Sequence, residues 1–262
     1  MAFESGIAGA VDTARNSRFT NQSDAKTVTG TPVFRAADVP HPFWPPGSHL
    51  PPEHIMTDNT YTADRTALLI VDPYNDFMSE GGKLYKAIEE TASEAGLFDN
   101  LRKIIPLVRE KDIKVFIVPH HRSTPGDFDH WQHLNMFQKA GLPHKAFEAG
   151  SWGGEFHPEF GPKPGDVIVK EHWAQSGFAN TDLDVLLKQH GIQRIILVGL
   201  IANSCIESTA RFGMELGYHV TLVTDATAAF SKDGMLAAKI NAPMYAHAIL
   251  TTGELVSALE AI

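Results

Sequence analysis

The chain has 262 residues, of which 43% are hydrophobic, and this is enough to form a substantial buried core. Its 31 acidic residues outnumber its 22 basic ones, and the formal net charge of -9 disfavours binding to nucleic acid or to an anionic membrane surface. No apolar run approaches the roughly 18 residues that span a bilayer, and no signal peptide pattern opens the chain. The single cysteine excludes an intramolecular disulfide. We therefore predict a soluble, cytoplasmic globular protein with neither a nucleic-acid nor a membrane partner.

Residues 1–62 lack the periodic apolar pattern of helices and strands. Their last part contains a proline-dense stretch from Asp38 to Glu53. Because proline fixes φ and removes a backbone donor, this stretch predicts an extended arm rather than a helix or a central strand. Phe43 and Trp44 lie within it, and such large aromatic side chains are seldom left in solvent. The arm either wraps its own domain or docks on a neighbouring subunit, and both interpretations stay open.

The segment 63–262 alternates short apolar runs with segments of helical spacing, and we predict that it forms one folded domain. The apolar runs are rich in β-branched residues and mostly lack polar alternation, as is typical of strands buried on both faces. The predicted strands are 67–71, 115–118, 167–169, 195–198, 220–223 and 248–250. The predicted helices are 97–109, 183–189, 204–216 and 234–241. Such alternation predicts βαβ units and a doubly wound α/β fold around a parallel sheet.

Three reactive side chains follow three of these predicted strands. Asp72 comes directly after the first strand, Lys170 directly after the third, and Cys205 just past the fourth. In an open α/β sheet, ligands bind beyond the carboxyl ends of the strands, where residues from separate units meet. Each residue taken singly also has an ordinary structural interpretation, as a turn carboxylate, a solvated lysine or an inert buried thiol. Their common position predicts a catalytic site.

The three residue types suit nucleophilic catalysis. Only the thiolate of a cysteine attacks well, and a thiol near its usual pKa of about 8.5 is mostly protonated at neutral pH. A helix beginning at Cys205, capped by Asn203 or Ser204, together with the Lys170 ammonium, is expected to depress that pKa. Asp72 is the expected general base, and the backbone N–H groups of the turn are an expected oxyanion hole.

Three segments around these residues resemble the motifs of the isochorismatase-like cysteine hydrolases. They are 68–72 with 75–77, then 165–170 with 176–178 and 181–183, and finally 198–210. They occur in the family's order and at family-like spacing. The resemblance implies that Asp72 is the catalytic base, Lys170 a second catalytic residue and Cys205 the nucleophile, with the backbone of Ile201 and Cys205 as the oxyanion hole.

The same resemblance implies a fold and an assembly. The expected fold has three layers around a six-stranded parallel sheet, and the expected assembly is a homo-oligomer, either a dimer or a tetramer. A non-proline cis peptide bond is implied in the nucleophile turn, between Leu200 and Ile201. No cofactor is implied.

Two departures from the family pattern bear on the site. Nicotinamidases of this family bind a metal through an Asp-x-His pair, and the matching place here holds Pro119 where the aspartate would stand. Because proline cannot ligate, we predict no such metal site, although a different one from Asp127, His130 and His133 is an alternative. The link from Lys170 to Ser176 is also longer than in many amidase members.

The favoured function is hydrolysis of an amide or carbamoyl C–N bond of a small molecule through a thioester intermediate. The enzymatic alternative is vinyl ether hydrolysis of the isochorismatase type, which needs a general acid but no nucleophile. The alternative outside the enzymes is a non-catalytic oligomeric scaffold. The expected substrate-binding residues are Phe77, His121, Trp152, His172, Trp173 and Phe178.

Overall fold

The computed structural model describes residues 60–262. The chain divides into two units, Met1–Pro51 and Pro52–Ile262, and the fold below is that of the described part of the second unit. The arm predicted for 1–62 therefore lies outside the described residues, apart from its last three. Tyr61, near the start of the described part, is buried, and its hydroxyl lies 3.0 Å from Thr221 Oγ1.

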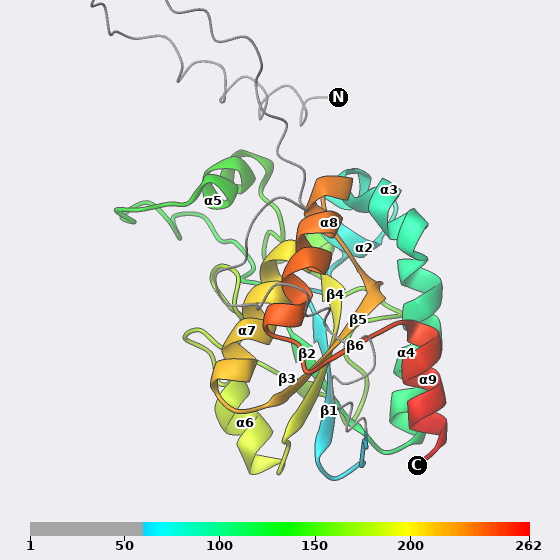
Figure 1. The fold of residues 1–262 in the computed structure, drawn as a ribbon. Helices are drawn as coiled ribbons and strands as arrows, with labels where there is room; N and C mark the ends of the chain where they lie inside the picture. Colours follow the sequence, from blue (N-terminus) through cyan, green and yellow to red (C-terminus); the bar gives the residue numbers. More distant parts are fainter. Residues whose placement is uncertain (1–59) are drawn as a thin grey trace, which may run out of the picture. The chain divides into compact units, whose positions relative to one another are not determined.

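Six strands form one sheet in the order β3-β2-β1-β4-β5-β6, and every neighbouring pair is parallel. Their bounds are β1 (Thr66–Val71), β2 (Lys114–Val118), β3 (Val167–Ile168), β4 (Arg194–Leu200), β5 (His219–Ala228) and β6 (Ala248–Leu250). All six predicted strands are confirmed. The largest difference is β5, which continues to Ala228 past a register irregularity against β4. Because the strands are parallel, their carboxyl ends share one edge of the sheet (Figure 1).

Helices cover both faces of the sheet, which confirms the predicted three layers. The helices are α2 (Asn75–Met78), α3 (Tyr85–Ala95), α4 (Leu97–Glu110), α5 (Met136–Gly141), α6 (Leu183–Gln189), α7 (Glu207–Glu215), α8 (Lys232–Asn241) and α9 (Thr252–Glu260). In Figure 1, α6 and α7 lie on one side of the sheet, and α4 and α9 lie on the other. None of the helices between residues 60 and 262 is both long enough and apolar enough to cross a membrane.

The central strands are buried on both faces, as their apolar sequences predict. All six residues of β1 are buried. Alternate residues of β1, such as Leu69 and Val71, join one core cluster with Leu187 of α6 and Ala210 of α7. Since side chains alternate along a strand, Leu68 and its alternates face the opposite layer. Each such side chain contributes roughly 1.5–3 kcal/mol through burial, so the strand ends that carry the site have a rigid base.

Candidate active site

Asp72 is held at the carboxyl end of β1 in an unusual backbone conformation. Its φ is 55°, in the left-handed region that residues other than glycine seldom adopt. Its backbone N–H donates to Val118 O at 3.0 Å, and its side chain is fully buried. Gly199 of β4 pairs with Val71, and a Cβ at this glycine would collide with the Val71 carbonyl oxygen. A positive φ and a close glycine neighbour together fix where the carboxylate lies.

The residue that meets Asp72 from β3 is His172, whereas Lys170 is exposed. Ile168 pairs with Ile117, and further along His172 pairs with His120. The second pair lies three residues after the first on the β2 side but four residues after it on the β3 side. This extra residue is a bulge, which changes the direction of the side chains that follow it. His172 is therefore fully buried, with Nε2 at 3.1 Å from Asp72 Oδ1.

The predicted convergence of Lys170 with Asp72 and Cys205 is corrected by this geometry. The Lys170 side chain is exposed and lines an open cleft at the outer edge of the sheet. Its backbone N–H donates to Asp182 Oδ1 at 2.7 Å, which explains part of the motif around it without involving its ammonium. The sequence predicts His172 only as a substrate-binding residue. The link to Ser176, which is long when counted from Lys170, is two residues shorter when counted from His172.

Cys205 lies in the irregular turn that follows β4. Residues Ala202–Ile206 form a single π-type turn that leads into α7, and Cys205 is 7% exposed. The peptide bond between Leu200 and Ile201 is cis, as predicted. The expected side-chain cap is absent, because neither this turn nor α7 has a side-chain cap hydrogen bond.

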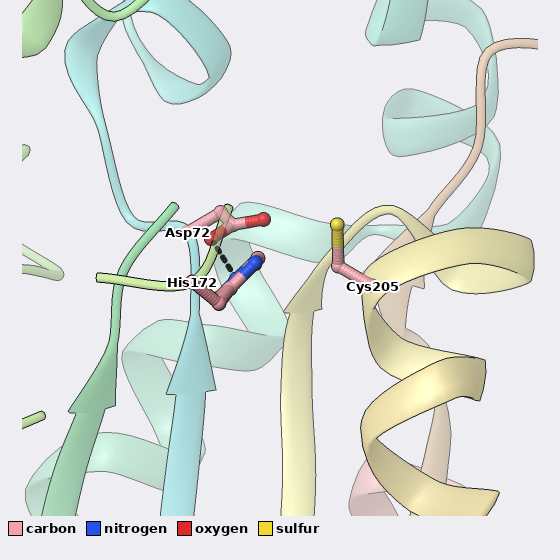
Figure 2. Close-up of side chains that lie close together, drawn as sticks. All are labelled: Asp72, His172 and Cys205. Carbon is pink, nitrogen blue, oxygen red and sulfur yellow. Dashed lines mark hydrogen bonds and ion pairs between the residues drawn. The ribbon is translucent and has the colours of Figure 1, made fainter. Parts of the chain in front are cut away.

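The three side chains converge from three separate strand ends. One ligand-type atom each from Asp72, His172 and Cys205 lies within 4.8 Å of the others, and all three residues are buried. Figure 2 shows one Asp72 oxygen bonded to His172 and the other directed towards Cys205. That second oxygen, Oδ2, has no hydrogen-bond partner within residues 60–262. A buried carboxylate oxygen thus faces a buried thiol.

The surroundings of Cys205 favour the protonated thiol over the thiolate. Burial raises the pKa of this thiol well above its ordinary value, and the negative charge of Asp72 raises it further. Hydrogen bonds involving Ser204 and the Ile201 backbone act in the opposite direction but do not compensate. The predicted depression of the pKa is therefore wrong, since Lys170 does not lie beside the sulfur. A nucleophilic Cys205 must lose its proton during attack, and Asp72 is placed to accept it.

A family model described as the Isochorismatase domain matches residues 66–254. The chain belongs to the isochorismatase family. It is 31% identical over 177 residues to a ureidoacrylate amidohydrolase RutB of Pantoea ananatis, covering 64% of this chain and 70% of the relative. A RutB protein of Serratia proteamaculans is 30% identical, over 64% of this chain and 71% of the relative.

Solved structures of other hydrolases show the same fold. A cysteine hydrolase from Pseudomonas syringae pv. phaseolicola matches with a TM-score of 0.66 and 25% identity, over 77% of this chain and 95% of that one. An N-carbamoylsarcosine amidase from Thermoplasma acidophilum matches with a TM-score of 0.53 and 26% identity, over 72% and 96% of the two chains. This chain is accordingly an isochorismatase-like hydrolase with the family's α/β architecture.

Of the other expected substrate-binding residues of this hydrolase, Phe77 and Phe178 are buried and Trp152 is exposed. Phe77 is buried against the rings of Phe147 and Phe230, with centroids 4.9 and 6.2 Å away. Phe178 belongs to the core cluster beneath α7, so packing accounts for its position. Trp152 is 55% exposed on a short turn. Their contact with substrate stays a prediction.

His121 and Trp173 form a stacked pair outside the buried centre. Their ring centroids are 3.7 Å apart, and both residues line the same open cleft of about 450 Å³ as Lys170. His121 bonds Asp127 at 2.7 Å and approaches Glu171 at 3.3 Å. Although burial alone would lower the pKa of His121, these two carboxylates raise it. Hydrogen bonds from His121 and from the backbone and side chain of Arg122 hold the pKa of Glu171 at about 2, against the effect of its burial.

The metal ligands of the nicotinamidase type do not fit this site. Pro119 occupies the aspartate position and offers no ligand atom. His120 uses Nδ1 in a 3.0 Å contact with the carbonyl oxygen of His121, and burial lowers its pKa, so it is neutral beside His172. The alternative set is not assembled either, because Asp127 is bonded to His121 while His130 and His133 are exposed.

Proposed function

We propose that this protein hydrolyses a C–N bond of a small amide or carbamoyl compound, with Cys205 as the nucleophile. The observation that carries the proposal is that the Cys205 thiol lies opposite Oδ2 of Asp72, which has no hydrogen-bond partner in the described part of the chain. A thiol and a base within reach of each other are what acyl transfer through a thioester requires. Burial of both groups strengthens their electrostatic interaction.

In the proposed first step, Asp72 takes the thiol proton as the sulfur attacks the carbonyl carbon. The C–N bond then breaks, and Asp72 returns the proton to the leaving nitrogen. This leaves an acyl or carbamoyl thioester on Cys205, which water hydrolyses. Backbone N–H groups of Ile201 and Cys205 are proposed to bind the oxyanion of the tetrahedral intermediate, and such donors contribute roughly 2.7–4 kcal/mol each.

His172 is proposed as a positioning residue in this mechanism. Its contact with Oδ1 of Asp72 fixes the carboxylate, so that Oδ2 faces the sulfur. The His120 ring packs edge-on against the His172 ring, with centroids 5.1 Å apart, and limits its rotation. Lys170 takes no part in this arrangement. The proposal therefore differs from the Asp-Lys-Cys triad that the sequence predicts.

The names of the relatives support the carbamoyl class of substrate. A ureidoacrylate amidohydrolase and an N-carbamoylsarcosine amidase are both named for compounds that carry a carbamoyl group on nitrogen. Vinyl ether hydrolysis remains the second candidate function, because a carboxylate such as Asp72 can act as a general acid without a thiol. The presence of Cys205 opposite Asp72 favours the first.

A substrate panel tests the proposal. Ureidoacrylate, N-carbamoylsarcosine and a simple primary amide are incubated with the protein and ammonia release is measured, while isochorismate is assayed in parallel. We expect turnover of at least one C–N substrate and its loss in Cys205→Ala. Turnover of isochorismate alone, undiminished in Cys205→Ala, would establish the vinyl ether reaction instead.

A further inference from the structure

We propose that Asp72, His172 and Cys205 form a binding site for a zinc-class divalent cation, and that this ion inhibits the enzyme. The three side chains offer an oxygen, an imidazole nitrogen and a sulfur, which are the three ligand types that Zn²⁺ accepts. Three protein ligands also leave a fourth tetrahedral position for water. Within residues 60–262, this is the one group of three or more potential ligands that lie close enough together to hold an ion.

The geometry needs only a small adjustment to coordinate an ion. Ligands of one tetrahedral zinc lie roughly 3.5 Å apart, given zinc–ligand bonds of about 2.0–2.3 Å. The Asp72–His172 contact is already 3.1 Å, and the sulfur lies within 4.8 Å of both. Closing the set therefore requires the sulfur to move inward by no more than about 1.3 Å. Each ligand comes from a different strand end, so the rigid sheet holds all three in place.

Unpartnered polar atoms point to a ligand at this position. Asp72 Oδ2 and His172 Nδ1 are buried and have no hydrogen-bond partner within residues 60–262. Leaving such a group unpaired costs about 1–3 kcal/mol, or more where it is charged. A cation between the carboxylate and the sulfur removes the cost at Asp72. The exposure of Lys170 matters as well, because its ammonium does not occupy the space where the cation would bind.

Binding requires no oxidant or other co-reactant. As the metal–sulfur bond forms, the S–H bond of Cys205 breaks and its proton passes to solvent. The lone pairs with which the sulfur attacks and Asp72 accepts a proton in the proposed reaction are then bound to the ion. Inhibition therefore rests on the proposed function, whereas binding depends only on the geometry of the three ligands.

Cobalt provides a direct readout of the site besides activity. The full chain is stripped with EDTA, dialysed and titrated with Co²⁺ and Zn²⁺. A cobalt–thiolate charge-transfer absorption and native mass spectrometry report ligation and stoichiometry. We expect one ion per chain, and an affinity lower by at least roughly 100-fold in Cys205→Ser and in His172→Lys. The control is His130→Ala/His133→Ala, which removes two exposed histidines and should leave binding unchanged.

The possible results separate the site from the reaction. Binding that survives both ligand substitutions, loss of binding in the control, or the absence of cobalt–thiolate absorption would overturn the proposed site. Unchanged thermal unfolding of Cys205→Ser shows that its loss of metal is not a loss of fold. Cobalt ligation in a protein that hydrolyses none of the panel would uphold the site and reject the proposed function. Hydrolysis unaffected by an ion that is shown to be bound would reject inhibition.

Discussion

His172 and Lys170 are two positions apart in the sequence, and their environments differ completely. One is buried against Asp72, and the other is exposed in the outer cleft. We expect His172→Ala to lower kcat/KM by roughly 100-fold or more, because the carboxylate that acts as base loses its orientation. Lys170→Ala should stay within about threefold of the wild type. Steady-state kinetics of both variants on the best panel substrate measures these effects. A larger loss in Lys170→Ala than in His172→Ala would restore Lys170 as the catalytic partner.

The raised pKa of Cys205 predicts how the metal-free thiol reacts with pH. Only the thiolate attacks iodoacetamide, so alkylation should be slow at pH 7 and still rising above pH 9. Asp72→Asn removes the negative charge that helps to raise the pKa, and it should speed alkylation at neutral pH by about tenfold, equivalent to one pKa unit. Intact mass measured against time follows both proteins. A wild-type rate that levels off below pH 8 would contradict the structure.

The thiol also links stability to pH. A group whose pKa is higher in the folded state keeps its proton there after the unfolded chain has lost it. Its contribution to stability is therefore complete below the unfolded thiol pKa of about 8.5, and it is lost as the pH rises above that value. Relative to Cys205→Ser, the wild type should lose stability between pH 8 and pH 10. Urea unfolding of both proteins at several pH values measures this difference.

At the scale of elements, the junction between β1 and β4 positions the carboxylate. Gly199 has a φ of 111°, and a side chain there would meet the backbone of Val71, next to Asp72. Gly217 has a similar φ of 91° but open space around it. Gly199→Ala should therefore lower the free energy of unfolding by at least about 2 kcal/mol more than Gly217→Ala. Equal losses in urea unfolding would mean that conformational strain alone, and not the close approach, fixes this junction.

The elements differ in how well the sequence predicts them. Strands such as β1 and β4 are continuous apolar runs, because parallel strands are buried on both faces. Helices α3 and α9 are not among the predicted helices, although Thr251 and Glu254 form a capping box at the start of α9 that the sequence displays. The bulge that follows β3 leaves only an indirect mark, the long link from Lys170 to Ser176, since a bulge is a property of the hydrogen bonding between two strands. This is why the sequence predicts that Asp72 and Cys205 lie together, but not that His172, rather than Lys170, lies beside them.

At the scale of the whole molecule, an exposed apolar face along α8 and the short turn that follows it bears on assembly. Leu236 and Ile240 of α8 and Met244 of the turn Ala242–Met244 recur every four residues and are 54%, 64% and 68% exposed. Residues at this spacing share one side of a helix, and a second copy of the chain is the partner we predict for it. Ile240→Glu should convert a dimer or tetramer to a smaller species in analytical ultracentrifugation. Val185→Glu, at an exposed site on α6, is the matched control, and a wild type that sediments as a monomer would contradict the prediction.

A covalent intermediate on Cys205 tests the whole account most directly. The protein is mixed with the best C–N substrate of the panel, quenched in acid within the first turnover, digested, and the peptide containing Cys205 is weighed. We predict an added acyl or carbamoyl mass on that peptide, which appears before product and is absent from Cys205→Ser. Turnover with no adduct, at a rate that Cys205→Ala retains within about tenfold, would contradict the account, because the thiol would then not be the nucleophile.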